Sequence, residues 1–158
     1  MVVRPADCSA FCLLNHRPGG PLLRLGLGPA LAPVGAMRQL SLLLEDHTHW
    51  AGGRSDRQLH RMLKGSQAIV SVWMGREMVG FGRATSDGAC RAVLWDVVVR
   101  ESLGGRGLGR WVVETLLAAE PVARAERVYL MTTHGVGFYE KIGFRWEQAQ
   151  KLMLLDRA

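Results

Sequence analysis

The spacing of apolar residues predicts two short helices in the first half of the chain. Residues 37–47 and 55–65 both carry apolar side chains at helical intervals. In the second stretch, Ser55 or Asp56 is a suitable N-cap and Gly65 a suitable stop. Both stretches are therefore expected to be amphipathic helices that cover a sheet.

Runs of apolar and β-branched residues predict the strands of that sheet. They are expected at residues 67–73, 78–86, 91–100, 127–133 and within 144–155. A turn at 74–77 joins the first two strands into a hairpin. The third strand is almost continuously apolar, which is typical of a central strand covered on both faces.

Two further helices are expected at 107–119, ended by Pro121, and at 135–143, ended by Gly143. The element order is helices, hairpin, strand, helix, strand, helix, strand. This order predicts an α/β (α+β) domain with a mixed sheet.

Composition changes near Met37, because five of the six prolines precede it. We expect residues 1–36 to form a partly ordered N-terminal arm, with a first strand around 22–27, and residues 37–158 to form the folded domain. The alternative is that the arm is upstream sequence and that Met37 is the true start.

Charge and cysteine content limit the function classes. The formal net charge of +6 favours anionic partners, but the positive charge is scattered and mostly arginine, which makes nucleic acid an improbable partner. Cys8, Cys12 and Cys90 show no metal-ligand spacing, so we expect no metal and a reducing, cytoplasmic location. No apolar run reaches the roughly 18 residues that span a bilayer, so no membrane association is expected.

The stretch LGGRGLGRW, residues 103–111, places four glycines between an apolar strand and a helix. Helix N-terminal amides lack partners, and glycines let a phosphate approach them closely. Arg106 and Arg110 would add positive charge to the same site. The alternative is a tight strand–helix turn that only serves packing.

Two motifs resemble the GNAT acetyltransferase superfamily. VVVRESLGGRGLGRWVVETLL is similar to its motif A, a strand followed by [RQ]-x-x-G-x-[GA] and a helix, and VGFYEKIGF is similar to its F-Y-x-x-x-G-F signature. GRATSD and LWDVVV add similarity to plastid and cyanobacterial members, which include serotonin N-acetyltransferases. The resemblance covers about residues 45–155. It departs from the motif at Gly104, where the family has Gln or Arg.

The resemblance implies a mostly antiparallel sheet of six or seven strands, flanked by about four helices, and acetyl-CoA as co-substrate. The implied coenzyme-binding residues are Val97, Val98, Val99, Gly104, Gly105, Arg106, Gly107, Leu108, Gly109 and Arg110. The loop residues would hold the pyrophosphate, and the valines the pantetheine.

Tyr139 and Asp96 are the candidate catalytic residues. Tyr139 matches the family tyrosine and would protonate the departing thiolate, unless it only packs. Asp96 is the one charge in an apolar run, and burying an unpaired carboxylate is costly. It would take the proton of the amine or hold a cationic substrate. Otherwise it is structural, bonded to backbone or to an arginine such as Arg83.

These features predict an N-acetyltransferase that acts on a primary amine by direct attack, and the similarity to serotonin N-acetyltransferases suggests a small arylalkylamine such as serotonin as the acceptor. The alternatives are a CoA-binding module with little catalysis, suggested by Gly104, and a basic nucleic-acid-binding protein. Monomer and homodimer both remain open.

Overall fold

A five-stranded sheet forms the centre of the computed structural model, which describes residues 10–16, 33–47 and 53–157. Its strands, in both chain and spatial order, are β1 (Cys12–His16), β2 (Ala68–Met74), β3 (Glu77–Ser86), β4 (Arg91–Val99) and β5 (Arg127–Tyr129). Neighbouring strands are antiparallel except β4 and β5, which are parallel. The predicted mixed, mostly antiparallel sheet is therefore confirmed.

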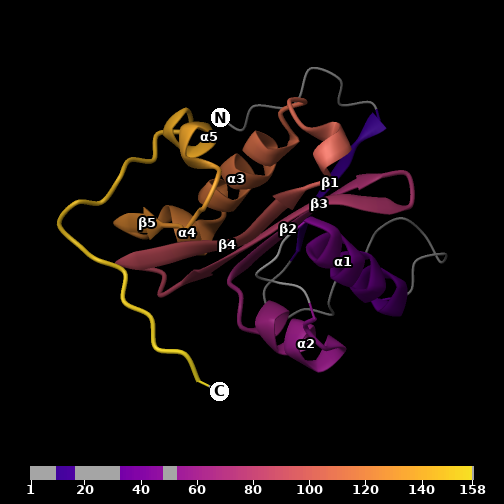
Figure 1. Cartoon of the computed structure of the whole chain (residues 1–158), viewed down its shortest axis with the longest axis horizontal. Coiled ribbons are helices and arrows are strands. Elements are labelled where there is room, and N and C mark those ends of the chain that lie inside the picture. The colour runs from indigo at the N-terminus through magenta and orange to yellow at the C-terminus, as the bar shows by residue number, and fades with distance from the viewer. Residues whose placement is uncertain (1–9, 17–32, 48–52, 158) are drawn as a thin grey trace.

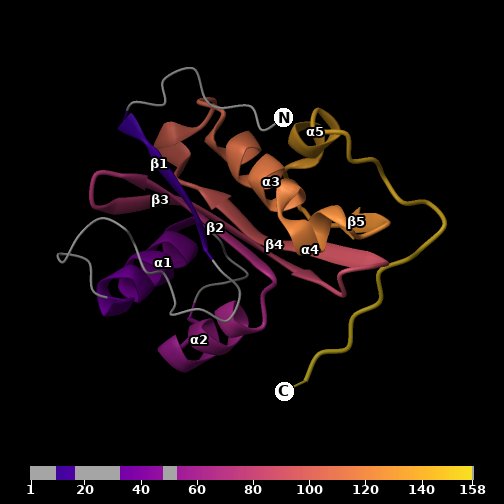
Figure 2. The ribbon, with the colours of Figure 1, turned by 180° about the vertical axis from the view of Figure 1, so that it is seen from behind.

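Helices cover both faces of the sheet. They are α1 (Pro33–His47), α2 (Asp56–Lys64), α3 (Leu108–Ala118), α4 (Glu120–Ala123) and α5 (Val136–Glu140). The first two lie on one side of the sheet and the other three on the opposite side (Figures 1 and 2). None of the helices in the described ranges is long and apolar enough to span a bilayer.

Two apolar clusters hold the layers together, one on each face of the sheet. The cluster under α3 includes Val70, Leu94 and Val112, and the cluster under α1 and α2 includes Leu40 and Phe81. Successive side chains of a strand point to opposite faces, so β2 and β3 supply both clusters. The continuous apolar run of β2 is buried on both sides for this reason.

The sheet has fewer strands than expected, because no strand forms within 144–155. An apolar run becomes a strand only when a neighbouring strand pairs with it, and the run Leu152–Leu155 is instead highly exposed. β5 is also shorter than the predicted 127–133. The strand expected around 22–27 lies outside the described residues, whereas β1 is found earlier in the arm.

The predicted helices differ from the observed ones mainly at their ends. α2 begins as expected, since Ser55 and Gln58 form a reciprocal capping box. α1 begins at Pro33, before the expected start. Pro121 follows the end of α3 and lies in the first turn of the short helix α4, a position where proline is well tolerated.

Candidate active site

The glycine-rich turn presents free backbone amides at the start of α3. Gly105 and Gly107 have φ angles of 77° and 80°, in the left-handed region that favours glycine. The first hydrogen bond of the helix runs from the Trp111 amide to the Gly107 carbonyl at 3.0 Å. In the described part of the chain, the amides of residues 108–110 therefore have no acceptor, and they are available to an anion.

The two arginines of this turn differ in whether they are already paired, and Gly104 has little room around it. Arg106 is exposed and makes no ion pair with the described residues, whereas Arg110 binds Glu114 at 2.7 Å. Gly104 donates its amide to the Glu101 carbonyl at 2.9 Å. A Cβ on Gly104 would lie 3.1 Å from that same oxygen, so this turn is tight for any larger residue.

An opening between β4 and β5 lies beside the turn. The two strands pair only from Arg91 to Val93 on β4, and no described strand pairs with β4 beyond that point on this side. On the other side, the Arg100 amide donates to Val79 of β3 at 2.9 Å. Because amides alternate along a strand, the Val99 amide faces the opening.

Gly109 marks the point where three predicted parts of the site meet. A Cβ at this position would lie 3.3 Å from the ring of Phe138 on α5 and 3.8 Å from Val99 on β4. The start of α3, the end of β4 and the start of α5 are thus in direct contact. Phe138 is 37% exposed and covers this glycine.

Tyr139 follows Phe138 on α5 and lines a cavity of about 630 Å³. Its ring contacts Phe138 and Phe144 edge-on and lies close to Gly135. No described residue accepts or donates a hydrogen bond at its hydroxyl. Burial raises the pKa of the Tyr139 hydroxyl above its ordinary value, so it is a protonated donor at neutral pH.

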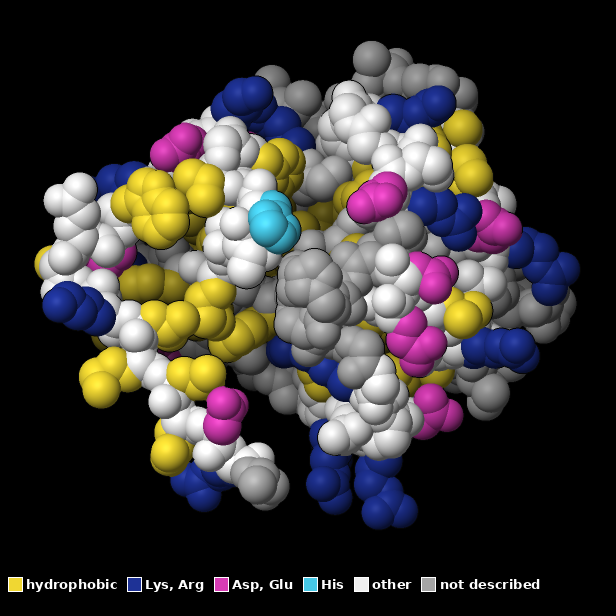
Figure 3. Space-filling view, in the orientation of Figure 1, with side chains coloured by type: hydrophobic (Ala, Val, Ile, Leu, Met, Phe, Trp, Pro, Cys, Tyr) yellow, Lys and Arg dark blue, Asp and Glu magenta, His cyan; other side chains and the backbone are white. Residues whose placement is uncertain are grey.

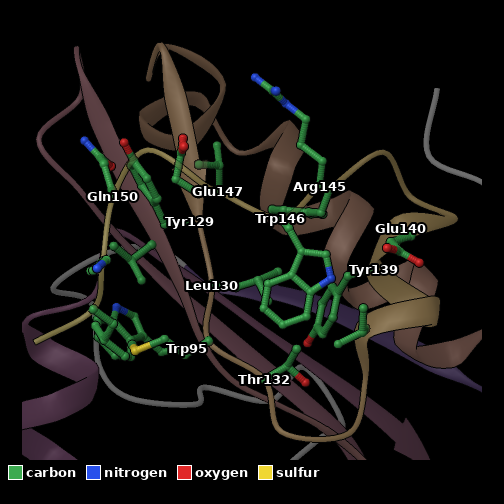
Figure 4. Close-up of a pocket in the computed structure, with 17 residues that line it drawn as sticks. Trp95, Tyr129, Leu130, Thr132, Tyr139, Glu140, Arg145, Trp146, Glu147 and Gln150 are labelled. Atoms are coloured by element: carbon green, nitrogen blue, oxygen red, sulfur yellow. The ribbon is translucent and has the colours of Figure 1, made fainter.

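The cavity is mainly aromatic and apolar. Its walls include Trp95, Tyr129, Leu130, Tyr139, Phe144 and Trp146, and its charged lining residues are Glu140, Arg145, Glu147 and Lys151. Figure 4 shows the hydroxyl of Tyr139 pointing toward Thr132 at the edge of this space. Figure 3 shows hydrophobic side chains gathered around a hollow on the side of the molecule that carries α5 and the C-terminal segment.

Asp96 is held by two arginines and does not line the cavity. Its Oδ2 accepts from Arg83 Nε at 2.6 Å and its Oδ1 from Arg54 at 3.1 Å. The carboxylate is almost fully buried, with 4% of the side chain exposed. The expected arginine partner, Arg83, is therefore present, and a second arginine joins it.

The structure brings most of the predicted residues together. Val97 and Val99 point toward α3, and Val98 points into the cluster under α1. Among the described residues, no three metal-ligating side chains come together. The sequence interpretation missed Arg54 as a partner of Asp96 and Trp95 as part of the cavity wall. No local pattern marks Arg54, because its partner is 42 residues away.

A glycine turn with free amides, next to an opened pair of parallel strands, is an arrangement of an α/β domain in which an anion can be bound. A family model described as an acetyltransferase (GNAT) domain matches residues 66–146, just over half of the chain. The chain belongs to the GNAT acetyltransferase family, and the predicted resemblance is confirmed.

Named relatives agree with this assignment. The chain is 39% identical over 97 residues to serotonin N-acetyltransferase 2, chloroplastic, of Oryza sativa subsp. japonica, which covers 58% of this chain and 48% of that protein. It is 37% identical over 87 residues to the uncharacterized N-acetyltransferase ycf52 of Pyropia yezoensis, which covers 52% of this chain and 50% of that protein. The chain thus spans about half the length of these curated relatives.

The fold also matches solved structures. A crystal structure of a GNAT-family acetyltransferase from Xanthomonas campestris pv. campestris superposes with a TM-score of 0.68 at 22% identity. The match covers 91% of this chain and 94% of the other. At this identity the likeness shows the shared fold.

Proposed function

We propose that the chain is an acetyl-CoA-dependent N-acetyltransferase that acetylates a primary amine by direct attack. The observation that carries the proposal is the meeting of three parts at Gly109: the free amides of α3, the open edge of β4, and α5 with Tyr139. One extended ligand can therefore contact the groups proposed to bind its anion, to polarise its carbonyl and to donate a proton.

Each part has a defined task in this reaction. Acetyl-CoA supplies the thioester carbon and the thiolate leaving group. The amides of residues 108–110 bind the diphosphate, with Arg106 as added positive charge. The Val99 amide donates to the thioester oxygen, where a fixed donor is worth several kcal/mol in the transition state. The hydroxyl of Tyr139 then gives its proton to the departing sulfur, and the proton that the attacking nitrogen loses passes to water and restores the hydroxyl, which leaves the amide and the free thiol of CoA.

We further propose that the acceptor is a small arylalkylamine. The aromatic walls of the cavity, Trp95, Tyr129 and Trp146, suit an aromatic ring, and Glu140 and Glu147 suit a cationic amine. The name of the rice relative points in the same direction. A reducing, cytoplasmic location remains a prediction, and Cys12 and Cys90 are both exposed free thiols.

Gly104 keeps one alternative open, which is coenzyme binding without turnover. The turn lacks the side chain that the family motif has at this position. Thermal unfolding with acetyl-CoA detects binding, since a ligand at 100 times its Kd stabilises the protein by about 2.7 kcal/mol in either case. Turnover is then measured over a panel of arylalkylamines, polyamines and peptide N-termini. Stabilisation without turnover of any acceptor supports the alternative.

The loop itself is tested by Gly109→Val, with Gly137→Ala as the matched control. The valine occupies the space next to Phe138 and Val99, so acetyl-CoA affinity should fall at least tenfold, about 1.4 kcal/mol. A Cβ added at Gly137 would have no atom within 4 Å, so that variant should bind normally. Equal affinity of the two variants would mean that the loop is only a turn.

A further inference from the structure

We propose that Asp96 is a positioning residue. Together with Arg54 and Arg83, it holds a bulge in β4 that turns the Val99 amide toward the opening beside β5. We call these three side chains the clamp. The ligand of the Val99 amide rests on the proposed function, but the structural role of the clamp does not.

The bulge is visible in the pairing of β3 and β4. Arg83 lies opposite Trp95 and Phe81 opposite Val98, so one residue of β3 faces two of β4, Asp96 and Val97. Asp96 has a φ angle of 50°, and it is the one non-glycine residue of the described chain with a positive φ. A residue keeps such a conformation only when its surroundings hold it there.

The bulge decides which face each later residue occupies. Leu94 packs in the cluster under α3, and regular alternation from it would place Val98 on the same face. Instead Val98 lies in the cluster under α1, and Val97 and Val99 contact residues on the α3 side. One extra residue has inverted the strand, and the Val99 amide faces the opening as a result.

Two guanidinium groups fix the carboxylate at the centre of this inversion. Arg83 approaches from β3 and Arg54 from the residues just before α2, at 2.6 Å and 3.1 Å. Arg54 also contacts Met62 Sδ at 3.2 Å, and Arg83 lies near Ser66 Oγ at 3.4 Å. The bulge is thereby tied both to the neighbouring strand and to α2. Charge-assisted bonds of this kind are short and directional.

Arg83 also contacts a residue in the wall of the cavity. The Arg83 guanidinium lies over the ring of Trp95 at 5.6 Å, and the Trp95 indole donates to Thr85 Oγ1 at 2.8 Å. Trp95 lines the cavity and Asp96 does not. The carboxylate is therefore placed to orient the strand and its tryptophan, with both oxygens already accepting hydrogen bonds, rather than to take a proton from an amine.

Asp96→Ala, Asp96→Asn and Arg54→Gln test the proposal. Arg124→Gln is the control, because the ion pair of Arg124 among the described residues is with the exposed Glu120 on α4. Hydrogen–deuterium exchange of the peptide covering residues 97–99 reports the bulge without any ligand. Exchange should quicken in all three clamp variants and not in the control. In Asp96→Ala, kcat should fall and acetyl-CoA KM should rise, each about tenfold, since the misplaced Val99 amide binds both the thioester and its transition state less well. Both changes should be smaller in Asp96→Asn, which keeps one acceptor oxygen. Arg54→Gln should add little to Asp96→Asn.

Unchanged exchange and KM in Asp96→Ala and Arg54→Gln would overturn the clamp, whatever their melting temperatures. A base at Asp96 would give a different result, with kcat equally low in the Ala and Asn variants and KM unchanged. Should the parent protein fail to bind acetyl-CoA at all, the proposed function falls, and the exchange measurement still decides the role of Asp96. Arg54→Gln keeps the test usable if Asp96→Ala does not fold, because Arg54 is more exposed than the carboxylate that it binds.

Discussion

At the scale of single residues, the hydroxyl of Tyr139 can be removed with little change to the surrounding structure. Tyr139→Phe keeps the ring contacts with Phe138 and Phe144 and deletes one proton donor. We expect kcat to fall about 10²-fold, as for loss of a general acid, with acetyl-CoA KM unchanged. Steady-state kinetics with a single amine acceptor measures both constants.

Tyr129→Phe is the comparison for that experiment, because Tyr129 is the other tyrosine of the chain and lines the same cavity. Its hydroxyl is buried without a partner among the described residues. Removing it should leave the free energy of unfolding unchanged or raise it. A loss of kcat as large as that of Tyr139→Phe would show that the effect is not specific to Tyr139.

His16 gives the protein a pH-dependent stability unrelated to catalysis. Its Nε2 lies 2.8 Å from Ser71 Oγ, which also accepts from the Trp73 indole. Burial lowers the pKa of His16 from 6.5 to about 4. Between pH 6.5 and about 4, His16 is protonated in the unfolded chain but neutral in the folded chain. Its contribution to stability is therefore complete above pH 6.5 and is lost as the pH falls toward 4.

The loss should be at most about 3 kcal/mol, from the size of the pKa shift. Urea unfolding at pH 7.5 and pH 4.5 measures it, and His16→Gln should remove the difference that this histidine causes. His60→Gln is the control, since His60 is exposed on α2. An identical pH dependence in His16→Gln and the parent would mean that His16 titrates freely in the folded state.

At the scale of elements, α3 lies against the sheet at a strand position that has no side chain. A Cβ on Gly82 of β3 would lie 2.6 Å from Val112 and 3.0 Å from Leu116, both on α3. Gly82→Ala should therefore destabilise the fold by about 1–3 kcal/mol through overpacking. Denaturant unfolding measures the change.

Val112→Ala provides the matching test, because it makes room for the new methyl group. Alone it should cost stability by leaving a cavity, but combined with Gly82→Ala the total cost should be smaller than the sum. Additive costs would show that α3 moves away from the sheet as a rigid body instead of meeting the alanine locally.

The elements also show where sequence interpretation succeeds. The caps of α2 are predictable because each acts locally: Ser55 and Gln58 cap the start of the helix, and Gly65 caps its end. The glycine turn is predictable for the same reason. The bulge at Asp96 is not, since the extra residue of β4 shows only in the pairing with β3, and Arg54, which binds Asp96, is 42 residues away. Leu152–Leu155 has the composition of a strand, but composition does not supply the partner that a strand requires.

At the scale of the whole molecule, the net charge of +6 is consistent with the proposed binding of an anionic coenzyme. Coenzyme A carries several negative charges on its phosphates, and the free amides and Arg106 lie where the diphosphate is proposed to bind. A positively charged protein attracts such a ligand over a distance, and salt screens that attraction. Acetyl-CoA affinity should therefore weaken several-fold between 50 mM and 500 mM NaCl.

A truncated donor separates this electrostatic term from the chemistry. S-acetyl-N-acetylcysteamine has the thioester and no phosphate, so its KM should be high and nearly independent of salt, while Tyr139→Phe should still reduce its turnover. Steady-state kinetics with both donors at the two salt concentrations measures this. The same salt dependence for both donors would place the effect on the acceptor or on the fold. A salt effect confined to acetyl-CoA would instead locate it at the phosphates, where the glycine turn offers its amides.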